Sequence, residues 1–514
     1  QSYFVPGSLR VCCSHKEFSA PSFFMHPRSI AHVIGTLLLV IGTSMLLPLA
    51  TTFFYDENDF QPILISMLIV LALGAPLRFF NPIFLELTIR DAVVVTVFGW
   101  SIICGVSTLP FLLSGAIPSF TDAFFEMMSG YTTSGATILR DIESLDHGLL
   151  MWRSETHFIG GMGFLTLTMI FLPHGMSGAN LFRSESSPGQ VITRERFLPR
   201  NRDAMIWLWI LYTIINGINI LLLRLGGMNW FDSICHAFST VATAGFSPKN
   251  ASMAHYGNAY FDWVTIVFMM LGGVTFMLYY HMVKGHWKVV WENTELRWYL
   301  GISLFFCGMV SLILWNVEMY PGFWEALRHG TFQVVSLLTT TGLVTADYEL
   351  WPVSAQLFLF TVCFIGACAG STTSGIKIVH YVILWKQLKH ELTKFFVHPG
   401  FIRSIRLSGQ KLDERLIQIA FAYFFLNILL VLAGACVMGM LNDIDFETAI
   451  SSTISALMNI GPGFGAVGPT DNYHHLSEVS KWILSWLMLV GRLELFTALV
   501  IFYPSFWKNG SSSL

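Results

Sequence analysis

Four short runs, rich in hydroxyl side chains and each containing a glycine, have the residue types and spacing that predict chemistry. The first reads SGYTTSGAT over 129–137, and its glycine is Gly135. Analogous runs contain Gly245, Gly342 and Gly461, so the glycines recur roughly every 100 residues, which indicates one structural unit used several times. Four such loops converging on one axis would offer backbone carbonyls in place of the water shell of a dehydrated cation.

Each run is expected to hold the ion with its glycine and the two residues before it. Glycine permits positive φ and close backbone approach, and Thr and Ser hydroxyls add oxygens. A single run of this kind is typical of an ordinary loop, whereas four copies at equivalent places favour a pore. The predicted ion-binding residues are Thr133, Ser134, Gly135, Thr243, Ala244, Gly245, Thr340, Thr341, Gly342, Asn459, Ile460 and Gly461.

The segments around each run follow one order: an apolar span, a short amphipathic stretch, the run and a second span. In the first unit the stretch 120–128 is too short to cross a bilayer, so it is predicted to be a re-entrant half-helix. Non-helical backbone at membrane depth must be buried in protein or line a watery cavity, which puts the runs at the centre. The spans and stretches are 91–114, 120–128 and 149–172; 204–225, 230–240 and 258–283; 297–317, 322–337 and 351–388; and 412–440, 446–457 and 477–503.

Composition places these elements in a lipid bilayer. The chain is 54% hydrophobic and 12% charged, against about 25% charged for soluble domains. We predict an all-α polytopic membrane protein with four pseudo-repeated helix–half-helix–loop–helix units around one central pore. The net charge of −3 gives no indication of a nucleic-acid partner. Most of the eight cysteines lie in apolar spans, so neither disulfides nor a structural metal site are expected.

The predicted division of the chain has six parts. Residues 1–24 are expected to be a tail or a remnant, and 25–85 an extra transmembrane hairpin. The linkers 183–202, 284–297 and 386–415 are basic, whereas the loops that follow the runs carry acidic residues, so the linkers are expected on the cytoplasmic side and the runs open outward. The four units are expected at 86–180, 181–290, 291–400 and 401–514.

A second feature, Gly366 to Gly375, interrupts the span 351–388. Seven of its ten residues are Gly, Ser or Thr, a composition that disfavours a continuous helix. An intramembrane loop that occludes the pore is favoured over a simple kink, and a phosphate-binding loop is disfavoured because no Walker pattern is present. The predicted gate residues in this loop are Gly370, Ser371, Thr372, Thr373, Ser374 and Gly375.

These runs, with Gly160-Gly161-Met162-Gly163-Phe164, resemble the Trk/Ktr/HKT superfamily of potassium transporters, and within it the Trk-type membrane subunits, over residues 25–507. Because all four positions hold glycine, the resemblance implies potassium at the twelve predicted residues. It also implies a homodimer in the bacterial inner membrane, no cofactor in this chain, and a cytosolic TrkA-like nucleotide-binding ring that controls the gate. The fourth run departs from the pattern with Asn459-Ile460, which puts a strict fourfold site in doubt.

An arginine in the last span completes the candidate site. A charge at membrane depth is costly unless it faces a cavity or a partner. The resemblance gives Arg492 a place in the pore below the runs, as an electrostatic barrier that also anchors the loop around Gly370. The alternative is a structural pair of Arg492 with Glu494 or with backbone.

Other functions are weighed by the residues they require. A proton- or sodium-coupled potassium symporter requires a buried titratable carboxylate, for which Glu494 is the one candidate in the sequence. A membrane enzyme requires clustered catalytic residues such as HExxH on a helix, and the sequence has none. A receptor or scaffold leaves the four runs unexplained. We therefore predict a gated potassium pore with no catalytic residues.

Overall fold

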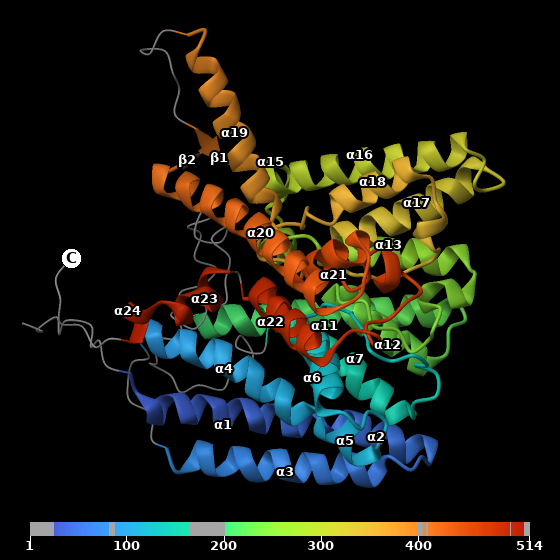
Figure 1. Ribbon diagram of the computed structural model, residues 1–514, viewed down its shortest axis with the longest axis vertical. Helices are drawn as coiled ribbons and strands as arrows, with labels where there is room; N and C mark the ends of the chain where they lie inside the picture. The colour runs from blue at the N-terminus through green and yellow to red at the C-terminus, as the bar shows by residue number, and fades with distance from the viewer. Residues whose placement is uncertain are drawn as a thin grey trace, which may run out of the picture.

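The computed structural model describes residues 25–81, 88–163, 201–397, 405–407, 410–493 and 495–507, with backbone alone for 201–204 and 410. Helices dominate these ranges, and one small antiparallel pair joins β1 (Arg406–Leu407) to β2 (Gln410–Lys411) (Figure 1). The predicted tail 1–24, the part of the first unit beyond residue 163, most of the linker 183–202, and Glu494 lie outside the described residues.

Six helical segments of the described ranges are long and apolar enough to cross a membrane. A further candidate consists of α13 (Ala259–Gly272) and α14 (Phe276–Val283), which are bent by 95° at a short break. The expectation of an all-helical polytopic protein is confirmed, but the expectation of an unbroken span over 258–283 is wrong. The six segments are Pro27–Tyr55, Phe60–Phe79, Ile89–Ser114, Met205–Leu225, Thr294–Asn316 and Glu414–Leu441.

The N-terminal hairpin packs tightly through small residues. It comprises α1 (Pro27–Ser44), α2 (Leu46–Tyr55) and α3 (Phe60–Phe79), and α1 lies alongside α3 at the lower edge of Figure 1. A Cβ at Gly74 would lie 2.9 Å from the Leu38 Cβ, so only glycine permits this spacing of the helices.

Most of the remaining helices form four units of similar order; α15 (Trp287–Glu292), α23 (Phe496–Leu499) and α24 (Pro504–Trp507) are short additions. The first contains α4 (Ile89–Ser107), α5 (Leu109–Ser114), α6 (Phe120–Tyr131) and α7 (His147–Gly161). The second contains α11 (Asn201–Leu225), α12 (Trp230–Ala242), α13 and α14. The third contains α16 (Thr294–Asn316), α17 (Phe323–Leu338), α18 (Val353–Val362) and α19 (Ile378–Lys394). The fourth contains α20 (Glu414–Leu441), α21 (Phe446–Met458) and α22 (Glu478–Arg492).

Burial separates the short second helix of each unit from the long spans. In α6 every residue from Ala123 to Tyr131 is buried. In α20 the buried residues recur every three or four positions, from Ala420 to Met438, so they form a single stripe. The short helices therefore lie at the centre, and the long spans present their other faces to the surroundings.

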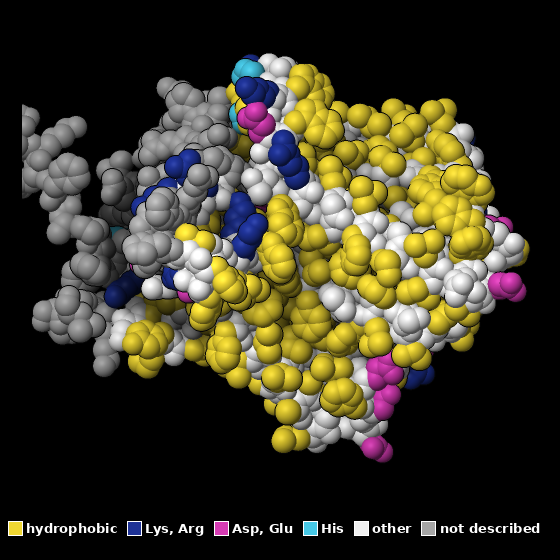
Figure 2. Space-filling view, turned by 90° about the horizontal axis from the view of Figure 1, so that it is seen from above, with side chains coloured by type: hydrophobic (Ala, Val, Ile, Leu, Met, Phe, Trp, Pro, Cys, Tyr) yellow, Lys and Arg dark blue, Asp and Glu magenta, His cyan; other side chains and the backbone are white. Residues whose placement is uncertain are grey.

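Charge is distributed unevenly over the surface. In Figure 2 most Lys and Arg side chains gather on one side of the view, and most Asp and Glu side chains lie on the opposite side, with hydrophobic side chains between them. α19 projects beyond the helical body at the top of Figure 1 and carries Lys386, Lys389 and Lys394. This separation agrees with basic linkers on one membrane face and acidic loops on the other.

Candidate functional site

The four predicted runs adopt one backbone conformation, and we call them the glycine loops. In each loop the residue two positions before the glycine is a non-glycine residue in the left-handed region, where such residues are uncommon. This backbone conformation costs about 1–3 kcal/mol of free energy per non-glycine residue, which contacts with the surrounding structure must offset. The values of φ are 56° for Thr133, 54° for Thr243, 53° for Thr340 and 54° for Asn459, and 81°, 94°, 75° and 102° for Gly135, Gly245, Gly342 and Gly461.

A backbone hydrogen bond fixes each loop to the end of its own short helix. The amide of the residue before the glycine donates to the carbonyl of a serine six positions before the glycine. Sequence reasoning missed these serines, although their recurrence at one spacing is a readable signal. The pairs are Ser134 to Ser129 at 2.9 Å, Ala244 to Ser239 at 2.9 Å, Thr341 to Ser336 at 2.7 Å, and Ile460 to Ser455 at 2.9 Å.

The loops form a closed ring. A Cβ placed on Gly245 would lie 2.5 Å from the Thr341 carbonyl oxygen, and one on Gly461 would lie 2.6 Å from that of Ser134. The other two contacts are closer still and join Gly135 to the Ala244 oxygen and Gly342 to the Ile460 oxygen. Each glycine thus faces the carbonyl that precedes the glycine of the next loop, in the order one, two, three, four and back to one.

The fourth loop differs in its side chains and keeps the backbone of the others. The Asn459 amide nitrogen donates to the Met488 carbonyl of α22 at 2.9 Å. The Gly461 carbonyl accepts bonds from the hydroxyls of Ser455 at 2.6 Å and Tyr473 at 2.8 Å. Gly461 therefore contributes chiefly through its missing side chain, which lets the neighbouring loop approach.

The span 351–388 is broken between α18 and α19, as the sequence predicted. The intervening loop lies against threonines of two glycine loops. The Thr243 hydroxyl lies 3.2 Å from the Thr372 hydroxyl, and the Ser374 amide donates to the Thr340 hydroxyl at 3.1 Å. We call residues 366–375 the intramembrane loop and the side of the ring that it occupies the inner side.

The intramembrane loop also fills the bend between α13 and α14. The Cys368 amide donates to the Gly273 carbonyl at 3.1 Å, and the Phe276 amide donates to the Gly370 carbonyl at 3.1 Å. The Thr372 hydroxyl lies 3.1 Å from the Gly272 carbonyl oxygen. Two broken helices thus satisfy each other's freed backbone groups, which explains how a 95° bend is tolerated.

Two charged residues that sequence reasoning missed also hold the intramembrane loop. Glu295, in the first turn of α16, accepts the Ala369 amide at 2.7 Å. The buried Lys377 donates to the Thr373 carbonyl and lies 3.2 Å from the Thr373 hydroxyl. Their signal was weak, because Glu295 is one of two acidic residues in the basic linker 284–297 and Lys377 follows the Gly-, Ser- and Thr-rich run within the span 351–388.

Arg492 joins this loop to the first glycine loop. Its Nη1 donates to the Thr133 hydroxyl at 3.0 Å and to the Thr372 carbonyl at 2.8 Å. Its Nη2 donates to the carbonyls of Gly160 at 2.5 Å and Gly161 at 2.9 Å, where α7 ends with partial negative charge. Arg492 therefore contacts the intramembrane loop, as expected, and also bonds to the backbone of α7, which was the alternative.

Comparison with known proteins identifies the family. A family model described as TrkH, cation transport protein, matches residues 60–509. The chain belongs to the TrkH family. TrkH of Salmonella typhimurium is 34% identical over 489 residues, which cover 94% of this chain and all of that protein, and TrkG of Escherichia coli K12 is 32% identical over 94% of this chain and 99% of that protein. Both are described as Trk system potassium uptake proteins.

A solved structure supports the same assignment. The crystal structure of the potassium transporter TrkH from Vibrio parahaemolyticus matches with a TM-score of 0.84 and 30% identity, covering 94% of this chain and all of that one. This TrkH-family chain is a multi-pass membrane protein of a cation transport family, and not an enzyme.

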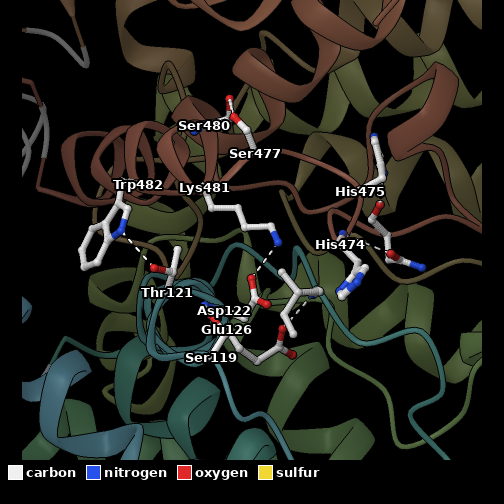
Figure 3. Close-up of polar contacts among 12 residues, drawn as sticks. Ser119, Thr121, Asp122, Glu126, His474, His475, Ser477, Ser480, Lys481 and Trp482 are labelled. Carbon is white, nitrogen blue, oxygen red and sulfur yellow. Dashed lines mark hydrogen bonds and ion pairs between the residues drawn. The ribbon is translucent and has the colours of Figure 1, made fainter. Parts of the chain in front are cut away.

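The first and last units of this TrkH-family chain meet on the outer side of the ring, where the chain continues after each glycine. Lys481 of α22 lies 2.6 Å from the Asp122 carboxylate of α6, and both are largely buried. The Trp482 indole donates to the Thr121 hydroxyl at 3.2 Å. Figure 3 shows both α22 side chains directed at the start of α6.

Hydrogen bonds to backbone carbonyls also join neighbouring units of this TrkH-family chain, in the same order as the glycine loops of the ring. The Tyr473 amide of the fourth unit donates to the Thr137 carbonyl of the first at 2.9 Å. The Tyr348 hydroxyl of the third unit donates to the Gly463 carbonyl of the fourth at 2.7 Å. The chain beyond the first and the fourth glycine loops is therefore supported by the neighbouring unit as well as by its own helix.

Proposed function

We propose that the ring of glycine loops is a potassium selectivity filter, and that the chain mediates potassium uptake through it. The observation that carries the proposal is the closed order in which each glycine faces a carbonyl of the next loop. Oxygen rings of this kind replace the hydration shell of potassium. The relatives described as Trk system potassium uptake proteins support the choice of ion.

Backbone carbonyls are the ligands that all four loops share. The residue before the glycine is Ser134, Ala244, Thr341 or Ile460, so only two of the four carry a hydroxyl. Threonines occupy the left-handed position in three loops and an asparagine in the fourth. The filter is therefore fourfold in its main chain and asymmetric in its side chains. In this proposal the pore units occupy residues 86–180, 181–290, 291–400 and 401–514, and 25–85 is the extra hairpin.

The proposed gate consists of the intramembrane loop, residues Gly370 to Gly375 above all, together with Arg492. The loop contacts Thr243 and Thr340 directly, so it closes the inner side of the ring. The guanidinium adds a positive charge at the same level, which repels a passing cation. Opening requires the loop to leave both the ring and the bend between α13 and α14.

Regulation from the cytosol fits this arrangement. α14 leads directly into a segment with Lys284 and Lys288, and α19 continues the loop into the basic projection of Figure 1. A cytosolic TrkA-like nucleotide-binding ring that docks on these basic segments would displace the loop through either helix. We also propose a homodimer, in the bacterial inner membrane, with no cofactor in this chain.

A second candidate, proton-coupled potassium symport, has one observation in its favour. The Glu295 carboxylate is bonded to the Ala369 amide of the intramembrane loop, so its protonation would weaken one loop contact. Glu295→Gln separates the two mechanisms. If the protein is a channel, a pH gradient alone should drive no potassium flux in either protein. If Glu295 couples the two ions, a pH gradient alone should drive potassium flux in the unmodified protein and not in Glu295→Gln.

Purified protein in liposomes provides the decisive test. A channel with this filter should pass K⁺ and Rb⁺ in preference to Na⁺, and should give discrete single-channel openings in symmetric potassium. Equal flux of the three ions contradicts the filter assignment. Selective flux without discrete openings, dependent on a proton or sodium gradient, supports the symporter instead.

A further inference from the structure

The short helices share one further position, nine residues before each glycine. Its occupants are polar and buried: Glu126, His236, Gln333 and Ser452. The first three form hydrogen bonds with the chain just beyond their own glycine. Glu126 accepts from the Thr137 hydroxyl at 3.0 Å, His236 lies 3.1 Å from the Ser247 hydroxyl, and Gln333 donates to the Ala346 carbonyl at 3.1 Å.

Glu126 differs from the others because it is charged and has four hydrogen-bonding contacts. Both of its carboxylate oxygens lie 3.0–3.1 Å from the Thr137 hydroxyl, and Oε2 also accepts the Ile138 amide at 3.0 Å. Oε1 accepts Nε of Arg153, from α7, at 2.6 Å. Both side chains of this ion pair are almost fully buried.

Arg153 carries the connection into the second unit. Its Nη1 donates to the Ser247 carbonyl at 3.0 Å, two residues beyond Gly245. Its guanidinium lies over the Phe246 ring at 3.6 Å from the centroid. One ion pair thus holds the chain that leaves the first glycine loop and the chain that leaves the second.

We infer that Glu126 and Arg153 are specificity-determining positioning residues, which fix the distance between the first and second glycine loops. The inference rests on the proposed filter. Discrimination between potassium and sodium depends on how the carbonyl oxygens are held. The planar guanidinium of Arg153 is bonded to the Ser247 carbonyl and to Glu126, which holds Thr137 and Ile138, so it limits the separation of the segments that follow the two loops. The first two loops are adjacent in the ring, since Gly135 faces the Ala244 carbonyl.

A purely stabilising role is the competing explanation. A buried ion pair contributes little net stability, because desolvation offsets its attraction. Removing only one partner leaves an unpaired buried charge and endangers folding. The test variant is therefore Glu126→Gln with Arg153→Gln, which removes both charges and keeps hydrogen-bonding groups at both positions.

The matched control removes another ion pair from the same helix. Asp122 lies one turn before Glu126 and pairs with Lys481 at 2.6 Å, a distance equal to that of Arg153 and Glu126. Among the described residues, the side chains of Asp122 and Lys481 bond to each other and to none of the residues that directly follow a glycine loop. Asp122→Asn with Lys481→Gln therefore tests loosening of α6 without release of the loops.

The measurement is the Na⁺-to-K⁺ permeability ratio, from reversal potentials of each variant in liposomes. We expect the Glu126/Arg153 double variant to raise this ratio about tenfold, equivalent to about 1.4 kcal/mol, and the control to leave it unchanged. An unchanged ratio in the first variant, or an equal rise in both, overturns the inference. Lack of potassium selectivity in the unmodified protein overturns the proposed filter itself, so the two failures are distinguishable.

If the double variant does not fold, Arg153→Lys provides the second measurement. Lysine keeps the charge beside Glu126 but cannot hold two acceptors with a planar fork. A raised Na⁺-to-K⁺ ratio in folded Arg153→Lys supports the inference, and an unchanged ratio overturns it.

Discussion

Arg492 donates a hydrogen bond to the Thr133 hydroxyl at 3.0 Å, although 359 residues of chain separate them. Thr133 occupies the left-handed position of the first glycine loop, and Arg492 ends the last helix of the fourth unit. The same guanidinium reaches the Thr372 carbonyl. Arg492 therefore bonds to both the ring and the intramembrane loop. Variants of Arg492, of the intramembrane loop and of the ring can be compared to measure what each contributes to flux and selectivity.

Replacing Arg492 by alanine is expected to raise ion flux. The change removes a positive charge beneath the ring and releases Thr372, and a loss of about 1.4 kcal/mol in the closed state corresponds to about tenfold more flux. Rubidium uptake into liposomes measures this rate. Arg492→Lys should give an intermediate value, and unchanged flux in Arg492→Ala would return this residue to a structural role.

Weakening the contact between the intramembrane loop and the bend is expected to favour the open state. Thr372→Val removes a hydroxyl that lies 3.0 Å from the Val241 carbonyl oxygen and 3.1 Å from that of Gly272. Open probability in single-channel records should rise several-fold, because each lost bond costs about 0.5–1.5 kcal/mol. Thr361→Val is the control, because Thr361 is exposed and its hydroxyl bonds, among the described residues, to the Leu357 carbonyl of the same helix. Deleting residues around Gly370 should also raise the open probability. If neither Thr372→Val nor this deletion changes the open probability, the intramembrane loop is not the gate.

Serine at Gly135 is expected to admit more sodium. Its Cβ would collide with the Ala244 carbonyl oxygen of the ring, and the φ of 81° is unfavourable for serine. Gly115→Ser isolates the second effect, since Gly115 has a φ of 75° and no atom within 4 Å of its Cβ position. Bi-ionic reversal potentials should shift only for Gly135→Ser, by about tenfold in permeability ratio. Equal shifts, or none, would show that the ring does not select.

Asp59 is expected to make folding stability depend on pH. It lies between α2 and α3, outside the membrane-spanning segments, and accepts the Leu149 amide at 3.1 Å. Burial, and then the carboxylates of Asp146 and Glu57, raise its pKa to about 6. Because the folded protein binds this proton more tightly than the unfolded chain, the free energy of unfolding decreases as the pH rises from about 4 to about 6.

Asp59→Asn should therefore raise Tm at pH 7 and reduce the dependence of Tm on pH over that interval. The expected gain in the free energy of unfolding at pH 7 is about 1 kcal/mol once solvent screening is allowed for. Thermal unfolding in detergent at about pH 4 and about pH 7 measures the change, because these values lie on either side of the interval. The exposed Asp471→Asn is the control, and a parallel pH profile for Asp59→Asn and the unmodified protein would contradict the prediction.

Local pattern was enough to predict several parts of this structure. The hydroxyl-rich runs identified Gly135 and its three counterparts, low helix propensity located the break after α18, and the cost of a charge in lipid singled out Arg492. These features depend on residues close together in the chain. Their recurrence indicated how many units to expect.

Contacts between residues far apart in the chain could not be predicted from local pattern. The order of the loops around the ring depends on four long-range approaches, such as Gly461 to Ser134. The 95° bend after α13 is stable because residues 366–375 complete its hydrogen bonds, and no local pattern encodes that partner. Glu126 was detectable in principle, since alignment of the units on their glycines shows a polar residue at its position in all four.

The meeting of the first and last units also bears on biosynthesis. A nascent chain enters the membrane from its N-terminus, so three of the four glycine loops are present before α21 and α22 have been inserted. Those two helices flank the fourth glycine loop and supply the Lys481 contact to Asp122 and the guanidinium of Arg492. In the proposed mechanism, conduction and its block would thus be completed in one late step, so that an unfinished molecule would lack a closed pathway for ions.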